Sequence, residues 1–162
     1  MSARRYCLTE RKGEKAMQIF ITGTPFETAQ ALDKRRLNKQ IIECRQILKA
    51  INGESKAWAN HPCVKMYRSH VEWLCHYLMA LGLYKEGDEE KARRWSGYAD
   101  RSRPKFHTQE YFNQMKRRLY AKDHEHYKQW SVYGESDVNW YYVEGEWLYY
   151  RNGKRLSSSL GK

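Results

Sequence analysis

The apolar residues in the first half of the chain recur every three to five positions, which is the spacing of one buried face of an α-helix. The first such run extends from Phe26 to about Ile51, and Asn52-Gly53 follows it as a pair that commonly ends a helix. Its apolar positions are Ala29, Leu32, Leu37, Ile41, Cys44, Leu48 and Ile51. The pattern predicts a single helix over residues 26–51.

The same periodicity predicts a second helix after residue 61. Pro62 suits a first helical turn, His61 can cap it, and an apolar stripe continues to Leu81. Residues 87–104 are richer in charge, and they predict a short helix after Asp88 followed by a polar, basic loop.

The last third of the chain changes from a helical to an alternating pattern. Thr108 can cap a third helix that reaches about Trp130. Residues 139–156 then alternate aromatic and polar side chains around two turn pairs, Glu-Gly and Asn-Gly, and predict a small β-meander. Residues 157–162 are expected to be a loose C-terminal end without regular secondary structure. We therefore predict a mainly α, single-domain protein with a small C-terminal β-hairpin or meander.

The composition favours a nucleic-acid partner. Lys and Arg number 30 against 19 Asp and Glu, a net charge of +11, and 14% of the residues are aromatic. Cationic side chains meet phosphates and aromatic rings stack on bases, so this combination is typical of nucleic-acid binding. A basic protein without such a partner fits the same counts. A chain of 162 residues is long enough for one domain with its own core.

Several classes of function have no support in the sequence. No apolar run is long enough to cross a membrane and no secretion signal is evident, so we expect a cytoplasmic protein with no membrane partner. The four cysteines form no CxxC pair, and the chain has neither a Gly-rich phosphate loop nor an HExxH motif. We expect no metal and no cofactor, and we expect a monomer.

Two groups of charged residues are candidates for a functional site. In the first helix, one polar stripe is formed by residues spaced three or four apart. Its members are Asp33, Arg36, Gln40 and Glu43, with Arg35 and Lys39 beside them. In the third helix, Arg118 and Lys122 lie one turn apart, and Trp130 and Tyr133 follow. Each group fits either a solvated face with weak ion pairs or a surface that binds phosphates and stacks on bases.

Several strings of the sequence occur in a recognisable order. LDKRRLNKQIIE ends at Glu43, NHPCVKMYRSH contains Pro62, and RLYAK, from Arg118 to Lys122, leads to a tryptophan and to VYG at 132–134. With the opening MQIF at Met17, they resemble the pyrimidine-dimer DNA glycosylases of the phage endonuclease V type. The resemblance is strongest to a bacterial and phage branch that begins MQxF, and it covers about residues 17–134.

The resemblance implies a fold and an activity. The implied fold is a compact bundle of three helices with the N-terminus threaded against the first one. Such enzymes cut the glycosidic bond of a damaged pyrimidine in double-stranded DNA and nick the strand by β-elimination, without a metal. On this basis residues 17–134 form the glycosylase-like domain and residues 135–162 a β-hairpin tail with a loose end, in a bacterial cell or a phage-infected host.

The resemblance also assigns roles to individual residues. The nucleophile of the family is the α-amine of the first residue, which forms a Schiff base at C1′ of the sugar, and Glu43 matches the glutamate that assists it. Arg118 and Lys122 match the basic pair of the last helix, and Trp130 and Tyr133 resemble its aromatic segment. Residues expected to surround the glutamate with positive charge and to hold phosphates are Arg35, Arg36, Lys39 and Arg45.

This mechanism makes the position of the first residue important. Codons for Lys12-Gly13-Glu14 can contain GGAG, the core of a bacterial ribosome-binding sequence, a short distance ahead of the Met17 codon. We therefore expect residues 1–16 to be a leader outside the native fold, with Met17 as the start and its amine as the nucleophile. The alternative is a non-catalytic DNA-binding or structured-RNA-binding protein that keeps the same scaffold.

Overall fold

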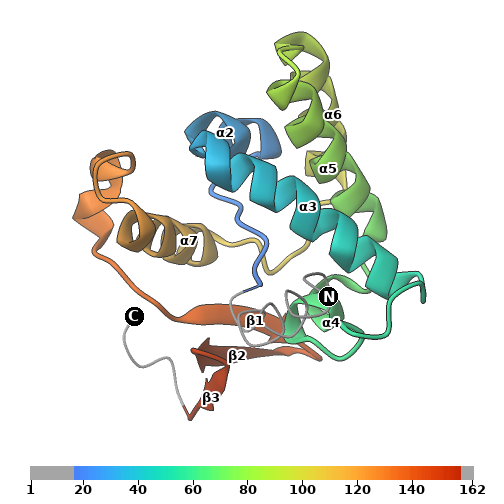
Figure 1. Ribbon diagram of the computed structural model, residues 1–162, viewed down its shortest axis with the longest axis vertical. Helices are drawn as coiled ribbons and strands as arrows, with labels where there is room; N and C mark the ends of the chain where they lie inside the picture. The colour runs from blue at the N-terminus through green and yellow to red at the C-terminus, as the bar shows by residue number, and fades with distance from the viewer. Residues whose placement is uncertain (1–16, 158–162) are drawn as a thin grey trace, which may run out of the picture.

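The computed structural model describes residues 17–157. Its elements, in chain order, are α2 (Pro25–Ala31), α3 (Lys34–Ile51), α4 (Pro62–Tyr67), α5 (Val71–Lys85), α6 (Glu89–Arg101), α7 (Gln109–Lys122), the 3₁₀ helix η2 (Lys128–Tyr133), β1 (Asn139–Val143), β2 (Glu146–Arg151) and β3 (Lys154–Leu156). The predicted class, mainly α with a small C-terminal sheet, is confirmed (Figure 1). The expected leader, 1–16, and residues 158–162 of the expected loose end lie outside the described residues.

The first predicted helix is divided in two. Thr24 caps α2 and forms a capping box with Glu27, and the helix ends at Leu32, whose ψ of 139° is extended. Asp33 is extended as well, and its backbone N–H donates to the hydroxyl of Tyr127 at 3.0 Å. This contact spans 94 positions of sequence, so the apolar periodicity across Leu32 gives no sign of the break.

The second predicted helix is also interrupted, and the region after it is more helical than expected. His61 caps α4 as predicted, accepting from the N–H of Cys63 at 3.0 Å, but α4 ends at Tyr67 and α5 begins at Val71. Asp88 caps α6, which extends to Arg101, so the polar loop expected there is helical. The buried residues of α6 are small, namely Ala92, Ser96 and Ala99, and they form a less apolar stripe than a run of Leu or Ile.

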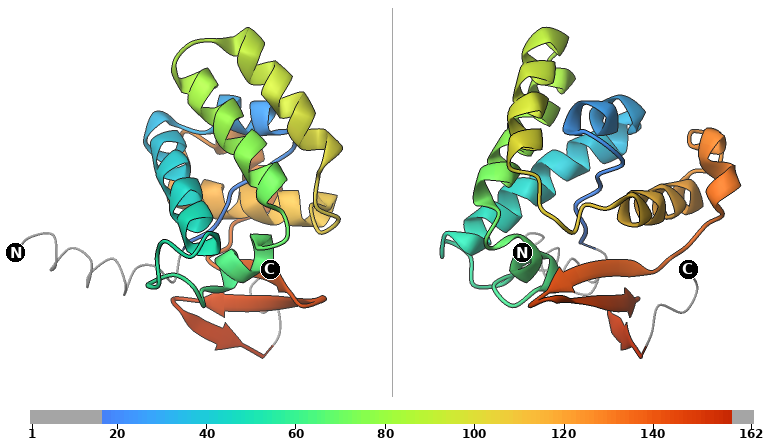
Figure 2. Two further views of the ribbon diagram at one scale, coloured as in Figure 1. Left: turned by 90° about the vertical axis from the view of Figure 1, so that its right-hand side faces the viewer. Right: turned by 180° about the vertical axis from the view of Figure 1, so that it is seen from behind.

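Within the described residues, the helices are thus shorter and more numerous than the apolar periodicity predicts. The third predicted helix is also shortened: Thr108 caps α7 as expected, but α7 ends at Lys122, and η2 covers the segment that contains Trp130. The helices α5 and α6 lie side by side at one end of the molecule, and the sheet lies at the other end (Figure 2).

The β-meander forms as predicted and contributes to the same core as the helices. β1 pairs with β2 from Asn139↔Tyr150 to Val143↔Glu146, and β3 adds antiparallel to β2. Both turn pairs have the positive φ angles of tight hairpin turns, for example 51° at Asn152. On β1, Trp140 and Tyr141 are 2% and 1% exposed. The residues of the expected tail are therefore part of the core.

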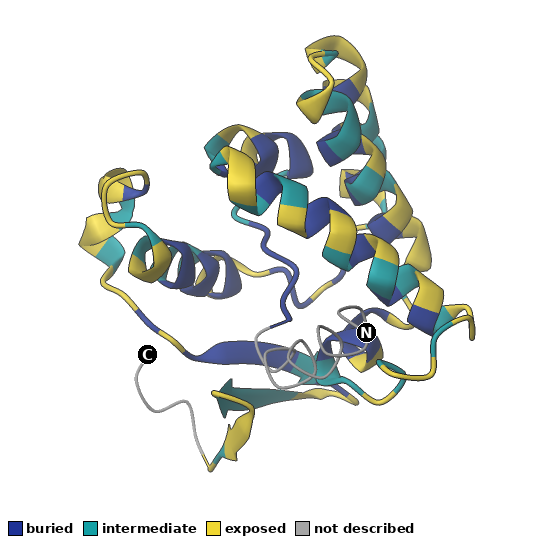
Figure 3. Cartoon of the chain, viewed as in Figure 1, coloured by how far each residue is buried: buried dark blue, intermediate teal, exposed yellow. Residues whose placement is uncertain are grey.

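An extended segment, residues 17–21, passes through the middle of the molecule. All five of its side chains are buried, and Figure 3 shows the segment as an extended dark blue stretch of chain between the helices. Its backbone is held by side chains from several elements: Gln40 of α3, Tyr77 of α5 and Tyr141 of β1. The start of the described chain thus lies against α3, as the resemblance implies.

Candidate active site

A small cavity brings together half of the candidate site residues that the sequence singled out. Its volume is about 150 Å³, and it lies between the first half of α3 and the end of α7. The residues that line it are Phe20, Arg35, Arg36, Lys39, Gln40, Glu43 and Lys122. One carboxylate, that of Glu43, therefore shares a cavity with four cationic side chains. We call this the Glu43 cavity.

Gln40 connects the carboxylate to the central segment. It lies one helical turn before Glu43 and is 1% exposed. Its Nε2 donates to the Glu43 Oε1 at 3.1 Å and to the Gln18 carbonyl at 2.8 Å. Its Oε1 accepts from the Phe20 N–H and from the Tyr77 hydroxyl, both at 2.8 Å. A fully satisfied buried amide fixes its neighbours, so the backbone at residues 18–20 and the carboxylate of Glu43 are held in one geometry.

Met17 lies next to this arrangement. Its side chain is 2% exposed, and its carbonyl accepts a hydrogen bond from the Tyr141 hydroxyl at 2.6 Å. Its neighbour Gln18 reaches Glu43 through one side chain, that of Gln40. Met17 and Glu43, which are far apart along the sequence, are therefore anchored to the same network.

Arg36 is positioned by an acidic residue at the start of α3. Its Nη1 contacts the Asp33 carboxylate at 3.2 Å, and the Tyr127 hydroxyl donates to the same carboxylate. Partial burial raises the pKa of Asp33, but the hydrogen bond from Tyr127 and the charge of Arg36 outweigh it and leave that pKa below its usual value. The ionised carboxylate therefore holds Arg36 at the wall of the cavity.

The two basic residues of α7 are in different environments. Lys122 lines the cavity, and its pKa is lowered to about 8 by desolvation and by the charges of Arg118, Lys39 and Arg36, against the opposing effect of Glu43. Arg118 is only 5% exposed, and its guanidinium lies 6.0 Å from the centre of the Phe20 ring. Burial lowers the pKa of Arg118, while Tyr141, Asp137 and Glu43 oppose that shift. Arg118 thus places a positive charge beneath the surface, close to a residue of the cavity wall.

Besides Arg118, three of the expected binding residues lie outside the cavity lining. Arg45 is exposed on another face of α3. On η2, Trp130 stacks on the Tyr127 ring with centroids 5.4 Å apart, and the Lys116 ammonium lies 4.9 Å from the centre of the Tyr133 ring. Because Tyr127 also contacts Asp33, this aromatic group is linked to the wall of the cavity. The roles of all three in DNA binding stay predictions.

Some residues that build the site were not singled out from the sequence. Phe20 and Tyr77 act through contacts that span many positions of the chain, and periodicity carries no sign of such contacts. Gln40 did give a signal, because it occupies the polar stripe of α3 one turn before the glutamate. A glutamine at the border between the polar and apolar stripes of a helix indicates a buried amide that hydrogen-bonds to another segment of the chain.

Residues 17–157 contain neither a candidate metal site nor a candidate membrane span. No group of three or more His, Cys, Asp or Glu side chains in this part of the chain could hold a metal ion. No helix in the same part is long and apolar enough to cross a membrane.

A comparison with known families supports the resemblance. Residues 17–84 match the family model described as pyrimidine dimer DNA glycosylase. The match includes Met17, Gln40 and Glu43, and it confirms the resemblance found in the sequence over that segment. Lys122 lies outside the match. Neither the search of the curated proteins nor that of the solved structures gave a match.

Proposed function

We propose that this protein, whose residues 17–84 match the pyrimidine dimer DNA glycosylase model, excises damaged pyrimidines from double-stranded DNA and nicks the strand at the resulting abasic site. The observation that carries the proposal is the Glu43 cavity, in which one carboxylate faces four cationic side chains. A carboxylate can stabilise positive charge on a sugar ring, and surrounding cations can hold phosphates on either side of that sugar. The protein's own residues supply this chemistry.

In the proposed reaction the α-amine of Met17 is the nucleophile. Its lone pair attacks C1′ of the damaged nucleotide, and the glycosidic bond breaks with its electron pair leaving on the base. Ring opening then gives a Schiff base between the amine and C1′. Loss of a proton from C2′ breaks the C3′–O bond, so the strand is nicked and the 3′ phosphate leaves. Glu43 stabilises the developing positive charge on the sugar and carries protons.

The choice of an α-amine has a physical basis. A terminal amine has an ordinary pKa of about 7.7 to 8.0, against about 10.4 for a lysine, so far more of it is unprotonated at neutral pH. Translation from Met17 would free such an amine. The hydrogen bond from Tyr141 to the Met17 carbonyl and that from Gln40 to the Gln18 carbonyl would hold it near Glu43.

The cations of the cavity are proposed to bind the strand. Arg35, Arg36, Lys39 and Lys122 would contact phosphates, with Arg118 adding positive charge from below. An enzyme must distort the duplex or extrude a base to reach C1′, and phosphate contacts help to offset that cost.

Other proposed contacts lie farther from the cavity. Trp130 and Tyr133 would stack on or wedge beside bases, and Arg45 would contact the backbone beyond the cavity.

Substitution of Glu43 tests the proposal. Glu43→Gln should lower the rate of strand cleavage at an abasic site by at least about 100-fold, which is the lower end of the effect of a proton-transferring group. Binding to the same duplex should persist, because the cations remain. Glu86→Gln is the matched control, since Glu86 is exposed at the end of α5 and does not line the Glu43 cavity. Cleavage that is equal in the two variants would contradict the proposal.

The alternative, a scaffold that binds DNA or structured RNA without chemistry, gives a different result in the same assay. It predicts no cleavage by the unaltered protein starting at Met17, with salt-sensitive binding that is weakened by Arg118→Ala and Lys122→Ala. The cleavage measurement therefore separates the two functions.

A further inference from the structure

A second and larger cavity lies in another part of the molecule. It has a volume of about 560 Å³, within the range of small-molecule and cofactor sites. It is formed by α4 and the residues after it, by the connection between α6 and α7, and by the end of β1. None of its residues lines the Glu43 cavity. We call it the α4–β1 cavity.

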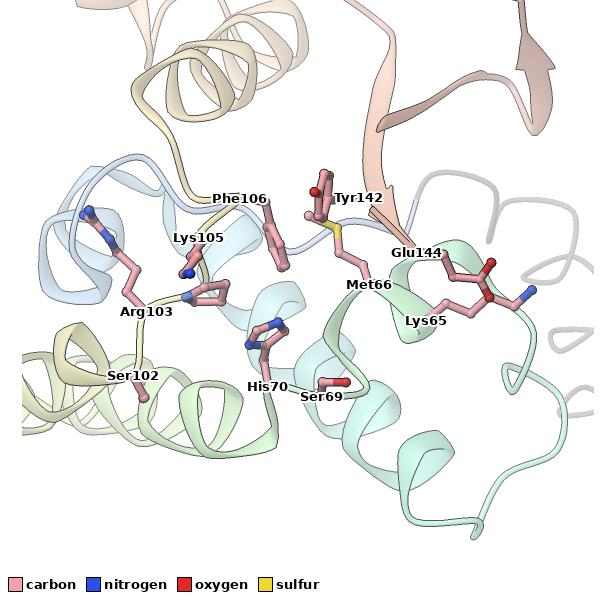
Figure 4. Close-up of a pocket in the computed structure, with 11 residues that line it drawn as sticks. Lys65, Met66, Ser69, His70, Ser102, Arg103, Lys105, Phe106, Tyr142 and Glu144 are labelled. Carbon is pink, nitrogen blue, oxygen red and sulfur yellow. The ribbon is translucent and has the colours of Figure 1, made fainter. Parts of the chain in front are cut away.

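The rim of this cavity is mostly basic. Lys65, Arg103 and Lys105 line it and are exposed, while Glu144 is its one acidic lining residue. Within the described part of the chain, none of the three cations forms a salt bridge. In Figure 4, Lys105 lies beside Phe106, and Lys65 stands on the opposite side of the cavity. Lys65 lies beside Glu144 there, so Lys105 is the cation placed to meet an anion next to the aromatic wall.

The inner wall is aromatic and apolar. The rings of Phe106 and Tyr142 have centroids 5.3 Å apart, and the His70 ring contacts Phe106 at 5.2 Å. Met66 and Pro104 complete this wall. Phe106 is buried, whereas Tyr142 and His70 are half-buried and present part of each ring to the cavity (Figure 4). Burial lowers the pKa of His70, so its imidazole is neutral at neutral pH and forms part of a flat, uncharged wall.

The hydroxyls of Ser69 and Ser102 also line the cavity and can exchange hydrogen bonds with the edge of a ligand. Flat rings, cations and hydroxyls in one concave site are the groups that recognise a base together with its phosphate. An acidic peptide would use the cations but would have no need of the aromatic wall.

We propose that the α4–β1 cavity binds one nucleotide, with the base against Tyr142 and His70 and the phosphate at Lys105. This site is separate from the Glu43 cavity and goes beyond the proposed repair reaction. The nucleotide could belong to an unpaired stretch of DNA or could be free in solution, because the recognising chemistry is the same. One experiment tests a nucleotide within a single strand, and a second tests a free nucleotide.

Photo-crosslinking locates the unpaired nucleotide directly. A four-nucleotide single strand carrying 5-iododeoxyuridine would be irradiated with the full-length protein, and the crosslinked peptide identified by mass spectrometry. The proposal predicts crosslinks at Tyr142 or His70. Lys105→Ser should reduce the crosslink yield at these positions at least about threefold, because a phosphate contact is lost. Lys154→Ser, an exposed cation on β3, is the matched control and should leave the yield unchanged.

Calorimetric titration with thymidine monophosphate tests the free nucleotide. Tyr142→Leu should weaken binding at least about fivefold, the lower end of the loss of one stacked base. Since this change also removes the ring contact with Trp147, Lys105→Ser serves as the second variant, and thermal unfolding confirms that each is folded. Detectable binding of the monophosphate identifies a free nucleotide as a ligand. Crosslinking at the cavity with no detectable binding of the monophosphate identifies a nucleotide within a single strand as the ligand.

Two results would overturn the proposal. One is crosslinking confined to other parts of the chain together with no binding of the monophosphate. The other is competition by inorganic phosphate as strong as that by the nucleotide, which would show an anion site without base recognition. Strand cleavage at an abasic site, measured in parallel, should be unchanged in Lys105→Ser. Failure of the repair reaction is therefore distinguishable from failure of this site.

Discussion

Lys122 offers a sharp test of how the Glu43 cavity binds DNA, because its charge depends on pH near neutrality. Its pKa is lowered to about 8 by desolvation and by three neighbouring cations. A group with this pKa is about nine-tenths protonated at one unit below 8 and about one-tenth at one unit above. An ordinary lysine stays charged over the whole of this interval. The contact between Lys122 and a phosphate should therefore be lost as the pH rises from 7 to 9.

The substitution Lys122→Arg isolates this effect, because an arginine stays protonated throughout. We expect the affinity of the unaltered protein for abasic duplex to fall between pH 7 and pH 9 more steeply than that of Lys122→Arg. Lys122→Met should reduce the slope of log affinity against log salt concentration by about 0.9, the contribution of one phosphate contact. The measurement is fluorescence anisotropy of a labelled abasic duplex at several salt concentrations for each pH.

The lowered pKa of Lys122 also makes the stability of the protein depend on pH. A lysine whose pKa is lowered on folding binds more protons in the unfolded state than in the native state between about pH 8 and its ordinary value of about 10.4. Stability should therefore rise with pH across this window, and Lys122→Met should be more stable than the unaltered protein at pH 7. For the binding prediction, the contradicting result is that the affinity of Lys122→Arg for abasic duplex depends on pH in the same way as that of the unaltered protein.

Three further predictions concern the fold that supports the site. Trp140→Ala should lower the free energy of unfolding by about 3 to 5 kcal/mol in urea titrations, because β1 is part of the core, and an unchanged midpoint would contradict that placement. Tyr141→Phe should cost about 1 to 3 kcal/mol in the same assay, since the buried Met17 carbonyl loses a donor. The lowered pKa of Asp33 means that its native contacts stabilise the protein above about pH 4 and that this stabilisation is lost as the pH falls through the native pKa. The difference in stability between Asp33→Asn and the unaltered protein should therefore shrink as the pH is lowered from 6, and a constant difference would contradict this.

Local sequence signals predicted the parts of the fold that local contacts determine. Thr108 caps α7, His61 caps α4 and the Asn-Gly pair turns the last hairpin, as expected. Each of these features depends on atoms within a few residues of one another. The residue type at the position is therefore enough to predict it.

The breaks in the helices depend on contacts that the periodicity does not contain. Leu32 continues the apolar stripe of the first helix, yet the chain turns there, where the next residue, Asp33, hydrogen-bonds to Tyr127, 94 positions away in the sequence. Residues 68–70 separate α4 from α5, and His70 in this link packs on Phe106. The length of α6 was underestimated because its buried stripe is made of Ala and Ser.

The structure brings some of the predicted site residues into one cavity, and their roles stay predictions. The polar stripe of α3 places Arg36, Lys39 and Glu43 on one face, and the structure adds Lys122 from α7 to the same cavity. Arg118, one turn before Lys122, was expected on the surface and is buried, because α7 packs that side against the core. The α4–β1 cavity is formed by residues from three separate parts of the chain, so no single stretch of sequence indicates it.

In the proposed reaction the amine of Met17 and the carboxylate of Glu43 act together on the sugar, and reductive trapping can detect the covalent intermediate of that step. Protein that starts at Met17 would be mixed with abasic duplex and borohydride, and the trapped peptide identified by mass spectrometry. We expect a covalent adduct on the Met17 α-amine. The yield of this adduct should be strongly reduced in Glu43→Gln, and no adduct should form when the amine is blocked beforehand. An adduct on Lys122 or another side chain, or no adduct with the free amine available, would contradict it.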